Sequence, residues 1–97
     1  MAELATNVID YLITITTQDT EYSQVIPYAV KAIEIDTVDG TAVRTSFETG
    51  KVATPTPPYI TVRANTTYRM IDLYLNKPTL YVACASGTKV AQVRVWY

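Results

Sequence analysis

The sequence predicts an all-β fold: an antiparallel two-sheet sandwich of about eight strands, jelly-roll-like in its connections. First, apolar and polar residues alternate with a period of two in several short stretches. Second, these stretches recur about every 8–12 residues between turn residues, and none shows a helical period. Third, sixteen threonines and eight tyrosines, which favour strands, stand against three glycines. The 97 residues are enough for one domain, 1–97.

The first third of the chain reads as a lead-in followed by two strands. Residues 1–7 form the lead-in, and the alternation from Ile9 to Thr16 then predicts a strand with one apolar face. Residues 17–20 are a turn, and a second strand runs over 21–26 until Pro27 ends it. Because the turn is so short, we expect the two strands to pair as a hairpin.

A second hairpin is expected around an Asp-Gly turn. The strand over 30–37 places Ile33 and Ile35 inward, and Val43, Thr45 and Phe47 mark the next strand. The intervening Val38-Asp39-Gly40 supplies the positive φ that a tight hairpin turn needs.

Residues 49–58 are the one long irregular stretch. Three prolines remove backbone donors and favour extended backbone there. Ten residues exceed the usual connection of about 4–6 residues. Such a loop is expected either to cross between the two sheets or to reach out to a partner.

The second half repeats the strand-and-turn pattern. Strands are expected over 59–63 and 67–75, the latter with Ile71, Leu73 and Leu75 on one side. Residues 79–84 and 90–97 predict a closing hairpin across the turn at 85–88. Because the strand pattern continues to Tyr97, we expect the chain end to be held in a sheet.

Composition argues against several classes of function. Single scattered charges with a net charge of −1 give no basic stripe for nucleic acid. No apolar run approaches the ~20 residues needed to cross a bilayer, and Met1 to Asn7 lacks the pattern of a signal peptide. Histidine is absent, which removes the commonest general base and metal ligand. Cys84, in an apolar strand, is interpreted as a small core residue rather than a reactive thiol.

Two acidic patterns are candidates for chemical sites. Glu34 and Asp36 share one strand face close to Asp39, so the three could bind calcium, although a solvated strand face followed by a turn explains them better. A glycosidase needs two carboxylates at a fixed separation in a cleft. A thin sandwich leaves little room for such a cleft. We therefore expect no enzyme, no metal and no cofactor. The acids from which a glycosidase pair could be drawn are Asp10, Glu21, Glu34, Asp36, Glu48 and Asp72.

The aromatic residues are more informative about function. Eight tyrosines are too many for a thin core to bury, and rings with polar tips suit contacts with other molecules. Such rings could stack on sugars or anchor a protein interface. The candidate partner contacts are Tyr59, Tyr81, Trp96, Tyr97, Pro55 and Pro57.

Three segments carry a resemblance: Thr79 to Val82 with the Ser86-Gly87 turn and Val90 to Trp96, Ile13 to Pro27, and Ala42 to Phe47. In them the chain resembles small virion proteins of tailed bacteriophages, of the capsid cement or decoration type. It departs from that group at Thr54 to Pro58, where a glycine-containing turn is more typical.

The resemblance implies a β-sandwich on the outside of the phage head, made in the cytoplasm of the host bacterium. The implied partners are the major capsid protein and further copies of the chain in a homotrimer, with no nucleic acid, membrane or small-molecule substrate. Two alternatives remain open: another virion component, such as a head-to-tail adaptor or a tail or fibre module, and a carbohydrate-binding module.

Overall fold

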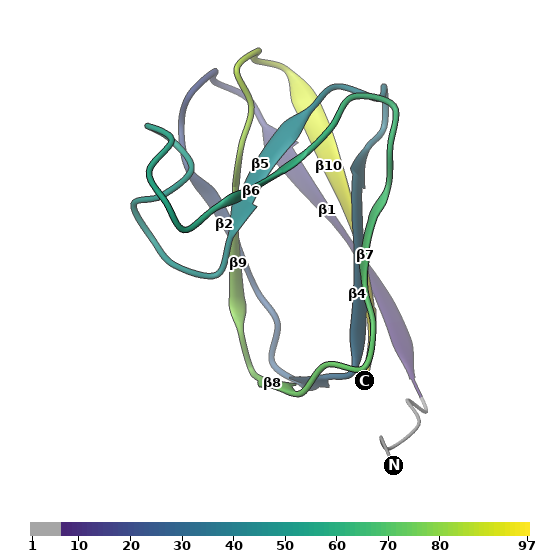
Figure 1. Cartoon of the computed structure of the whole chain (residues 1–97). Helices are drawn as coiled ribbons and strands as arrows, with labels where there is room; N and C mark the ends of the chain where they lie inside the picture. Colours follow the sequence, from purple (N-terminus) through teal and green to yellow (C-terminus); the bar gives the residue numbers. More distant parts are fainter. Residues whose placement is uncertain (1–6) are drawn as a thin grey trace.

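The computed structural model describes residues 7–97, and all of their regular structure is β-strand (Figure 1). The predicted lead-in lies outside the described residues except for Asn7. Asn7 and Tyr97 exchange two backbone hydrogen bonds of 2.9 Å, so the prediction that the chain end is held in a sheet is confirmed. The strands are β1 (Val8–Ile15), β2 (Tyr22–Val25), β3 (Ala29–Val30), β4 (Ala32–Thr37), β5 (Val43–Ser46), β6 (Ile60–Val62), β7 (Tyr68–Met70), β8 (Leu75–Asn76), β9 (Thr79–Ala83) and β10 (Lys89–Trp96).

The strands form two antiparallel four-stranded sheets and one short pair. Sheet A has the order β1-β10-β4-β7, and sheet B has the order β2-β9-β5-β6. The β3–β8 pair lies at the lower end of the two layers in Figure 1. The all-β, two-sheet prediction is therefore confirmed.

The pairing makes the chain one long hairpin that is wound into two layers. Each strand of the first half pairs with its mirror-image strand of the second half: β1 with β10, β2 with β9, β3 with β8, β4 with β7 and β5 with β6. In the pairs Val8–Trp96 and Val25–Thr79, residue 52 lies midway in the sequence between the two partners. The other three strand pairs are centred within one residue of it. Further pairing of β10 with β4 and of β9 with β5 joins successive turns of this ribbon.

All three local hairpins predicted from the sequence are wrong. β1 and β2 lie in different sheets, as do β4 and β5, and β9 and β10. The turns themselves exist: Gly40 has a φ of 80°, and its N–H donates to the carbonyl of Thr37 at 3.3 Å. Each turn, however, carries the chain across to the other sheet. The turn after β9 pairs instead with the turn after β1, since Asp19 N–H donates to the carbonyl of Cys84 at 2.8 Å.

The predicted strand over 67–75 is also interrupted. β7 ends at Met70, Asp72 has a φ of 55°, and the chain re-enters a sheet only at Leu75. As a result, Ile71 does not share the apolar face predicted for it, and its side chain is 63% exposed.

The core lies between the two sheets and follows the predicted alternation. Side chains of β1, β4, β9 and β10 point inward at every second position, so burial repeats with a period of two except at Ala83, which is also buried. Cys84 is 1% exposed within this core, which confirms its interpretation as a core residue. The largest fully buried side chains of the core include Ile15, Ile26, Ile33, Ile35, Leu80, Val82, Val93 and Val95.

Candidate functional site

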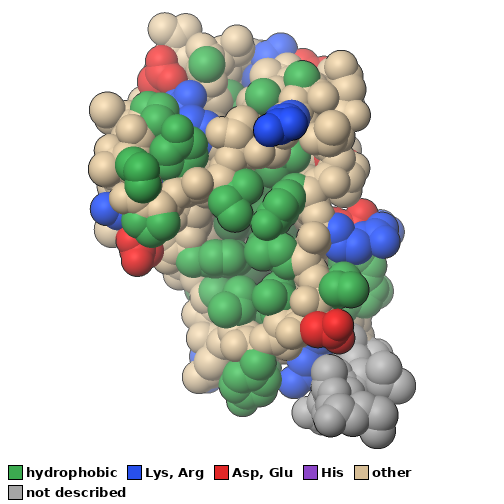
Figure 2. Space-filling view, in the orientation of Figure 1, with side chains coloured by type: hydrophobic (Ala, Val, Ile, Leu, Met, Phe, Trp, Pro, Cys, Tyr) green, Lys and Arg blue, Asp and Glu red, His purple; other side chains and the backbone are tan. Residues whose placement is uncertain are grey.

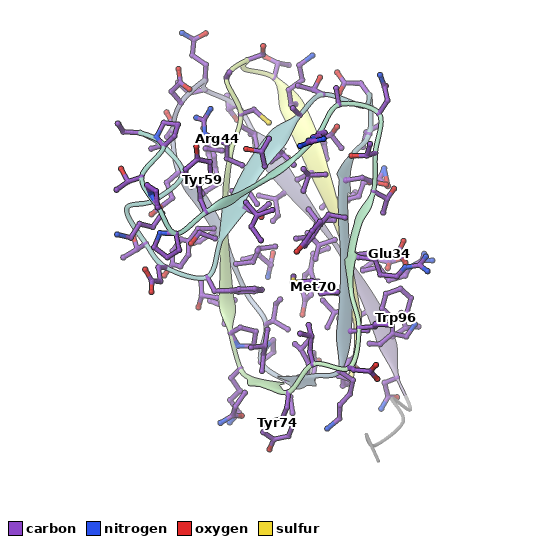
Figure 3. The ribbon with its side chains drawn as sticks, in the orientation of Figure 1. Glu34, Arg44, Tyr59, Met70, Tyr74 and Trp96 are labelled. Carbon is purple, nitrogen blue, oxygen red and sulfur yellow. The ribbon has the colours of Figure 1, made fainter. Side chains whose placement is uncertain are left out.

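An apolar groove of about 260 Å³ opens between the two sheets, along the edge strands β6 and β7. Figure 2 shows hydrophobic side chains gathered in this hollow, and in Figure 3 Met70 lies between the two layers. Phe47 and Ile60 line the groove and remain partly exposed to solvent, at 36% and 46%. Its apolar lining comprises Ile35, Phe47, Pro58, Tyr59, Ile60, Tyr68, Met70 and Leu80.

Hydroxyl groups of β5 fix the wall of the groove that β6 forms. Thr45 Oγ1 donates to the carbonyl of Ile60 at 3.1 Å, and Ser46 Oγ donates to the carbonyl of Pro58 at 2.9 Å. Ser46 Oγ also accepts a bond from the N–H of Glu48 at 3.0 Å. These bonds hold the backbone on both sides of Tyr59, so the ring starts from a fixed position at the groove.

The apical loop, residues 47–59, joins β5 to β6 within sheet B and folds back on that sheet's outer face (Figure 1). It therefore does not cross between the sheets. Glu21 holds it by accepting hydrogen bonds from Thr49 Oγ1 at 2.7 Å and from Gly50 N–H at 2.8 Å. Val52 and Ala83 are completely buried and yet lie outside the main core cluster. The loop thus covers a small second core on sheet B.

A row of alternating charges crosses the outer face of sheet A. Asp10, Arg94, Glu34 and Arg69 occupy directly paired positions on β1, β10, β4 and β7. Arg94 donates to the carboxylate of Asp10 through Nε at 2.7 Å and through Nη2 at 2.9 Å. Arg69 Nη2 lies 3.2 Å from Glu34 Oε1. The hydrogen bonds from Arg94 lower the pKa of Asp10, and those to Asp10 raise the pKa of Arg94. A shallow hollow of about 230 Å³ lies over this row.

The three acids that could have formed a calcium site are each bound to a different group. Glu34 faces Arg69, Asp36 accepts a bond from Thr67 Oγ1 at 3.0 Å, and Asp39 binds Lys89 Nζ at 2.7 Å. Lys89, with the N–H of Thr41, lowers the pKa of Asp39 to about 2. Over residues 7–97, no group of three or more His, Cys, Asp or Glu residues is placed to hold a metal ion.

The predicted contact residues are distributed over several surfaces. Tyr59 lines the groove, whereas Pro55 and Pro57 are exposed on the apical loop. Tyr81 alternates with buried Leu80 and Val82, which places it on the outer face of sheet B.

The two aromatic residues at the chain end lie on opposite sides of sheet A. Trp96 lies on its outer face, on the same side as Glu34 in Figure 3. Tyr97 packs on the core and stacks on Tyr28 with ring centroids 3.8 Å apart. Of the six candidates, only Tyr59 belongs to the groove.

Sequence reasoning missed Phe47, Ile60, Tyr68 and Met70 as groove residues. Alternation places Phe47 on one strand face with Val43 and Thr45, whereas it places Met70 on the side opposite to the predicted apolar face of its strand. They are partly uncovered because β6 and β7 are edge strands of three residues each, too short to close the sandwich along that side. The sequence carries no clear signal of this opening, because the alternation after Asn65 continues to Leu75 and predicts one long strand.

Across residues 7–97 the structure contains no helix that is long and apolar enough to span a membrane. No family model and no curated protein matches this chain. Among solved structures, it is similar to a de novo designed double-stranded β-helix determined by solution NMR, with a TM-score of 0.53 and 11% sequence identity. The similarity covers 95% of this chain and 100% of the designed chain, and it agrees with the wound hairpin described above.

Proposed function

We propose that this protein is a bacteriophage capsid decoration protein that binds the major capsid protein through the apolar groove between its sheets. The observation that carries the proposal is the partly uncovered row of Phe47, Tyr59, Ile60 and Met70 on a fixed frame. Aromatic residues and methionine are enriched at protein interfaces. Contiguous exposed apolar surface marks sites of association.

The fold supports the same proposal. We interpret the wound hairpin as a jelly roll, an architecture that also serves in viral capsid domains. A decoration protein needs no reaction chemistry. It stabilises a shell because it binds assembled capsid more tightly than free subunits, and many sites per shell make modest contacts sufficient.

The test uses capsids assembled from the major capsid protein encoded in the same genome, expanded and without this chain. The purified protein should sediment with these capsids and raise their melting temperature. Absence of a capsid gene from that genome, or absence of binding to capsids that accept another decoration protein, would remove the proposal.

A pair of matched variants tests the groove itself. Ile60→Thr lowers the apolar character of the groove, whereas Val25→Thr makes the same kind of change at a site 59% exposed on β2. Both replacements remain β-branched and therefore suit a strand. We expect Ile60→Thr to weaken capsid binding about tenfold, roughly the effect of 1.4 kcal/mol, and Val25→Thr to leave it unchanged.

Two alternatives predict different results in the same experiments. A head-to-tail adaptor or a tail or fibre module would be present in few copies per particle, whereas a decoration protein would be present in many. A carbohydrate-binding module would use Tyr59 and Tyr68, which both line the groove, to stack on sugar rings. Binding on a glycan array that is lost in Tyr59→Ala would favour that alternative.

A further inference from the structure

The outer face of sheet A carries a charge pattern that is complementary to itself. Across the four strands the signs alternate: Asp10 negative, Arg94 positive, Glu34 negative and Arg69 positive. All four side chains retain some exposure, from 22% for Glu34 to 63% for Arg69. Another molecule that approaches this face therefore meets the whole row.

The pattern selects one orientation for a second copy. If the copy is turned about a twofold axis that runs along the strands between β10 and β4, its order of strands is reversed. Asp10 then faces Arg69 of the second copy, and Arg94 faces Glu34 of the second copy. A twofold axis that runs across the strands would instead place each charge opposite its own equivalent, and like charges at an interface are strongly unfavourable.

One neighbouring row agrees with the same axis. One row further along, β1 carries Val8, β10 carries Trp96 and β4 carries Ala32, with Val8 54% exposed. Ile71 follows the end of β7 at the opposite edge of the sheet and is 63% exposed. The reversal of strand order brings Val8 toward Ile71 of the second copy and Trp96 toward Ala32, so apolar side chains meet apolar ones.

We infer that the outer face of sheet A binds a second copy of this chain, forming a symmetric dimer about an axis parallel to the strands. β1 and β10 have eight residues each, β4 has six and β7 has three. At about 3.4 Å per residue and about 4.8 Å between strands, they present roughly 400 Å² per copy. The total falls below the 1,200–2,000 Å² typical of stable complexes. The dimer is therefore weak and, because charge pairs dominate it, sensitive to salt. It differs from the homotrimer that the resemblance implies. It leaves the groove between the sheets free, so it stands independently of the proposed capsid contact.

The first test measures the mass of the wild-type protein by sedimentation and light scattering. From about 10 µM to about 1 mM protein, the mass should rise from one chain to two at low salt. It should return to one chain at about 0.5 M salt. NMR amide shifts that change with concentration should be confined to β1, β4, β7 and β10. A monomer throughout this range, a trimer, or shifts centred on sheet B would overturn the inference.

The second test exchanges charges between two variants. In a dimer of Glu34→Arg, the new positive charge at position 34 of each copy faces the positive Arg94 of the other copy. In Arg94→Glu, position 94 is negative and faces the negative Glu34. Each variant alone should therefore dimerise at least tenfold more weakly than the wild type.

A mixture of the two variants restores opposite charges at every facing position and should form a heterodimer. Arg63→Glu, an exposed charge reversal outside sheet A, is the matched control and should dimerise like the wild type. Circular dichroism checks that the variants fold. If they do not, the concentration-dependent NMR amide shifts of the wild-type protein decide whether the outer face of sheet A binds a second copy. Folded variants that fail to form the heterodimer, or that dimerise alone as the wild type does, would contradict the inference.

Discussion

Arg44 Nε donates a hydrogen bond of 2.6 Å to the backbone carbonyl of Val52, the residue on which the long hairpin is centred. The same guanidinium reaches the carbonyl of Ala53 at 3.3 Å and the carboxylate of Asp19 at 2.8 Å. The Arg44 side chain is 14% exposed, so these bonds form largely out of water. One side chain of β5 therefore connects the apical loop to the turn between β1 and β2.

Replacement of Arg44 by methionine should release the apical loop from sheet B. The carbonyls of Val52 and Ala53 would lose a charged donor, and such bonds contribute about 1.5–3 kcal/mol each. Because one side chain makes both bonds and the loop can admit water, we expect a total loss of about 2–3 kcal/mol in the free energy of unfolding. Denaturant unfolding measures that loss, and hydrogen exchange should accelerate at 49–56.

Arg63→Met is the matched control, because Arg63 is exposed just beyond β6. We expect it to change the free energy of unfolding by less than about 0.5 kcal/mol. Equal losses in the two variants, or unchanged exchange in the loop of Arg44→Met, would mean that the guanidinium does not hold the loop.

Val52→Ala should destabilise the protein although Val52 lies in a loop. Its side chain is completely buried on the outer face of sheet B, with Ala83 buried in the same way. Loss of two methyl groups and the remaining cavity should cost about 1.5–3 kcal/mol in the free energy of unfolding. Denaturant unfolding of Val38→Ala, at a position that is 61% exposed, provides the comparison. A loss no larger than that of Val38→Ala would show that the loop is not packed on the sheet.

The sequence predicted many inward faces correctly because alternation is a local property, but at β7 Met70 and not Ile71 packs on the core. Ile33 and Ile35, for example, are both buried as expected. Pairing is different, because an Asp-Gly turn fixes the direction of the chain only over a few residues. Gly40 has the predicted positive φ, yet the turn leads into the other sheet. The sheet to which each strand belongs is determined by long-range pairing, such as that of β1 with β10, which begins with Val8 and Trp96. No local sequence pattern reveals pairing between residues so far apart in the chain.

The candidate site was less accessible from sequence for a related reason. Tyr59 was identified because it follows the prolines, but its groove neighbour Phe47 directly follows β5 in sheet B, and Met70 belongs to β7 in sheet A. Tyr97 was predicted as a partner contact on the same ground as Tyr59, the large number of tyrosines, but its ring is stacked on Tyr28. Residue type alone does not distinguish a ring that closes a core from a ring that lines an opening.

Stability should depend on pH through Asp39. Its pKa is lowered to about 2 in the folded protein, first by the hydrogen bond from Lys89 and then by Thr41. An unfolded aspartate has a pKa of about 3.9. The carboxylate therefore stabilises the fold above pH ~4, and this contribution is lost as the pH falls toward 2.

Asp39→Asn should accordingly lower the melting temperature at pH 7, and its difference from the wild type should narrow between pH 4 and pH 2. Thermal unfolding followed by circular dichroism at several pH values measures this. Glu48→Gln, at an exposed position on the apical loop, is the control and should not reproduce the pattern. A difference between Asp39→Asn and the wild type that stays constant down to pH 2 would contradict the role of the charge.

Cys84 should be unreactive in the folded protein. Its side chain is 1% exposed, and burial raises the pKa of its thiol, so both access to the sulfur and the thiolate fraction are low. A chromogenic disulfide reagent at pH 8 should label it only as fast as the protein opens, and at once in denaturant. Ser86→Cys adds a thiol at an exposed position two residues later in the same turn, which provides an internal comparison. That variant should show one fast and one slow equivalent. Two fast equivalents in the native state would mean that the end of β9 is open to solvent and that Cys84 is not packed in the core.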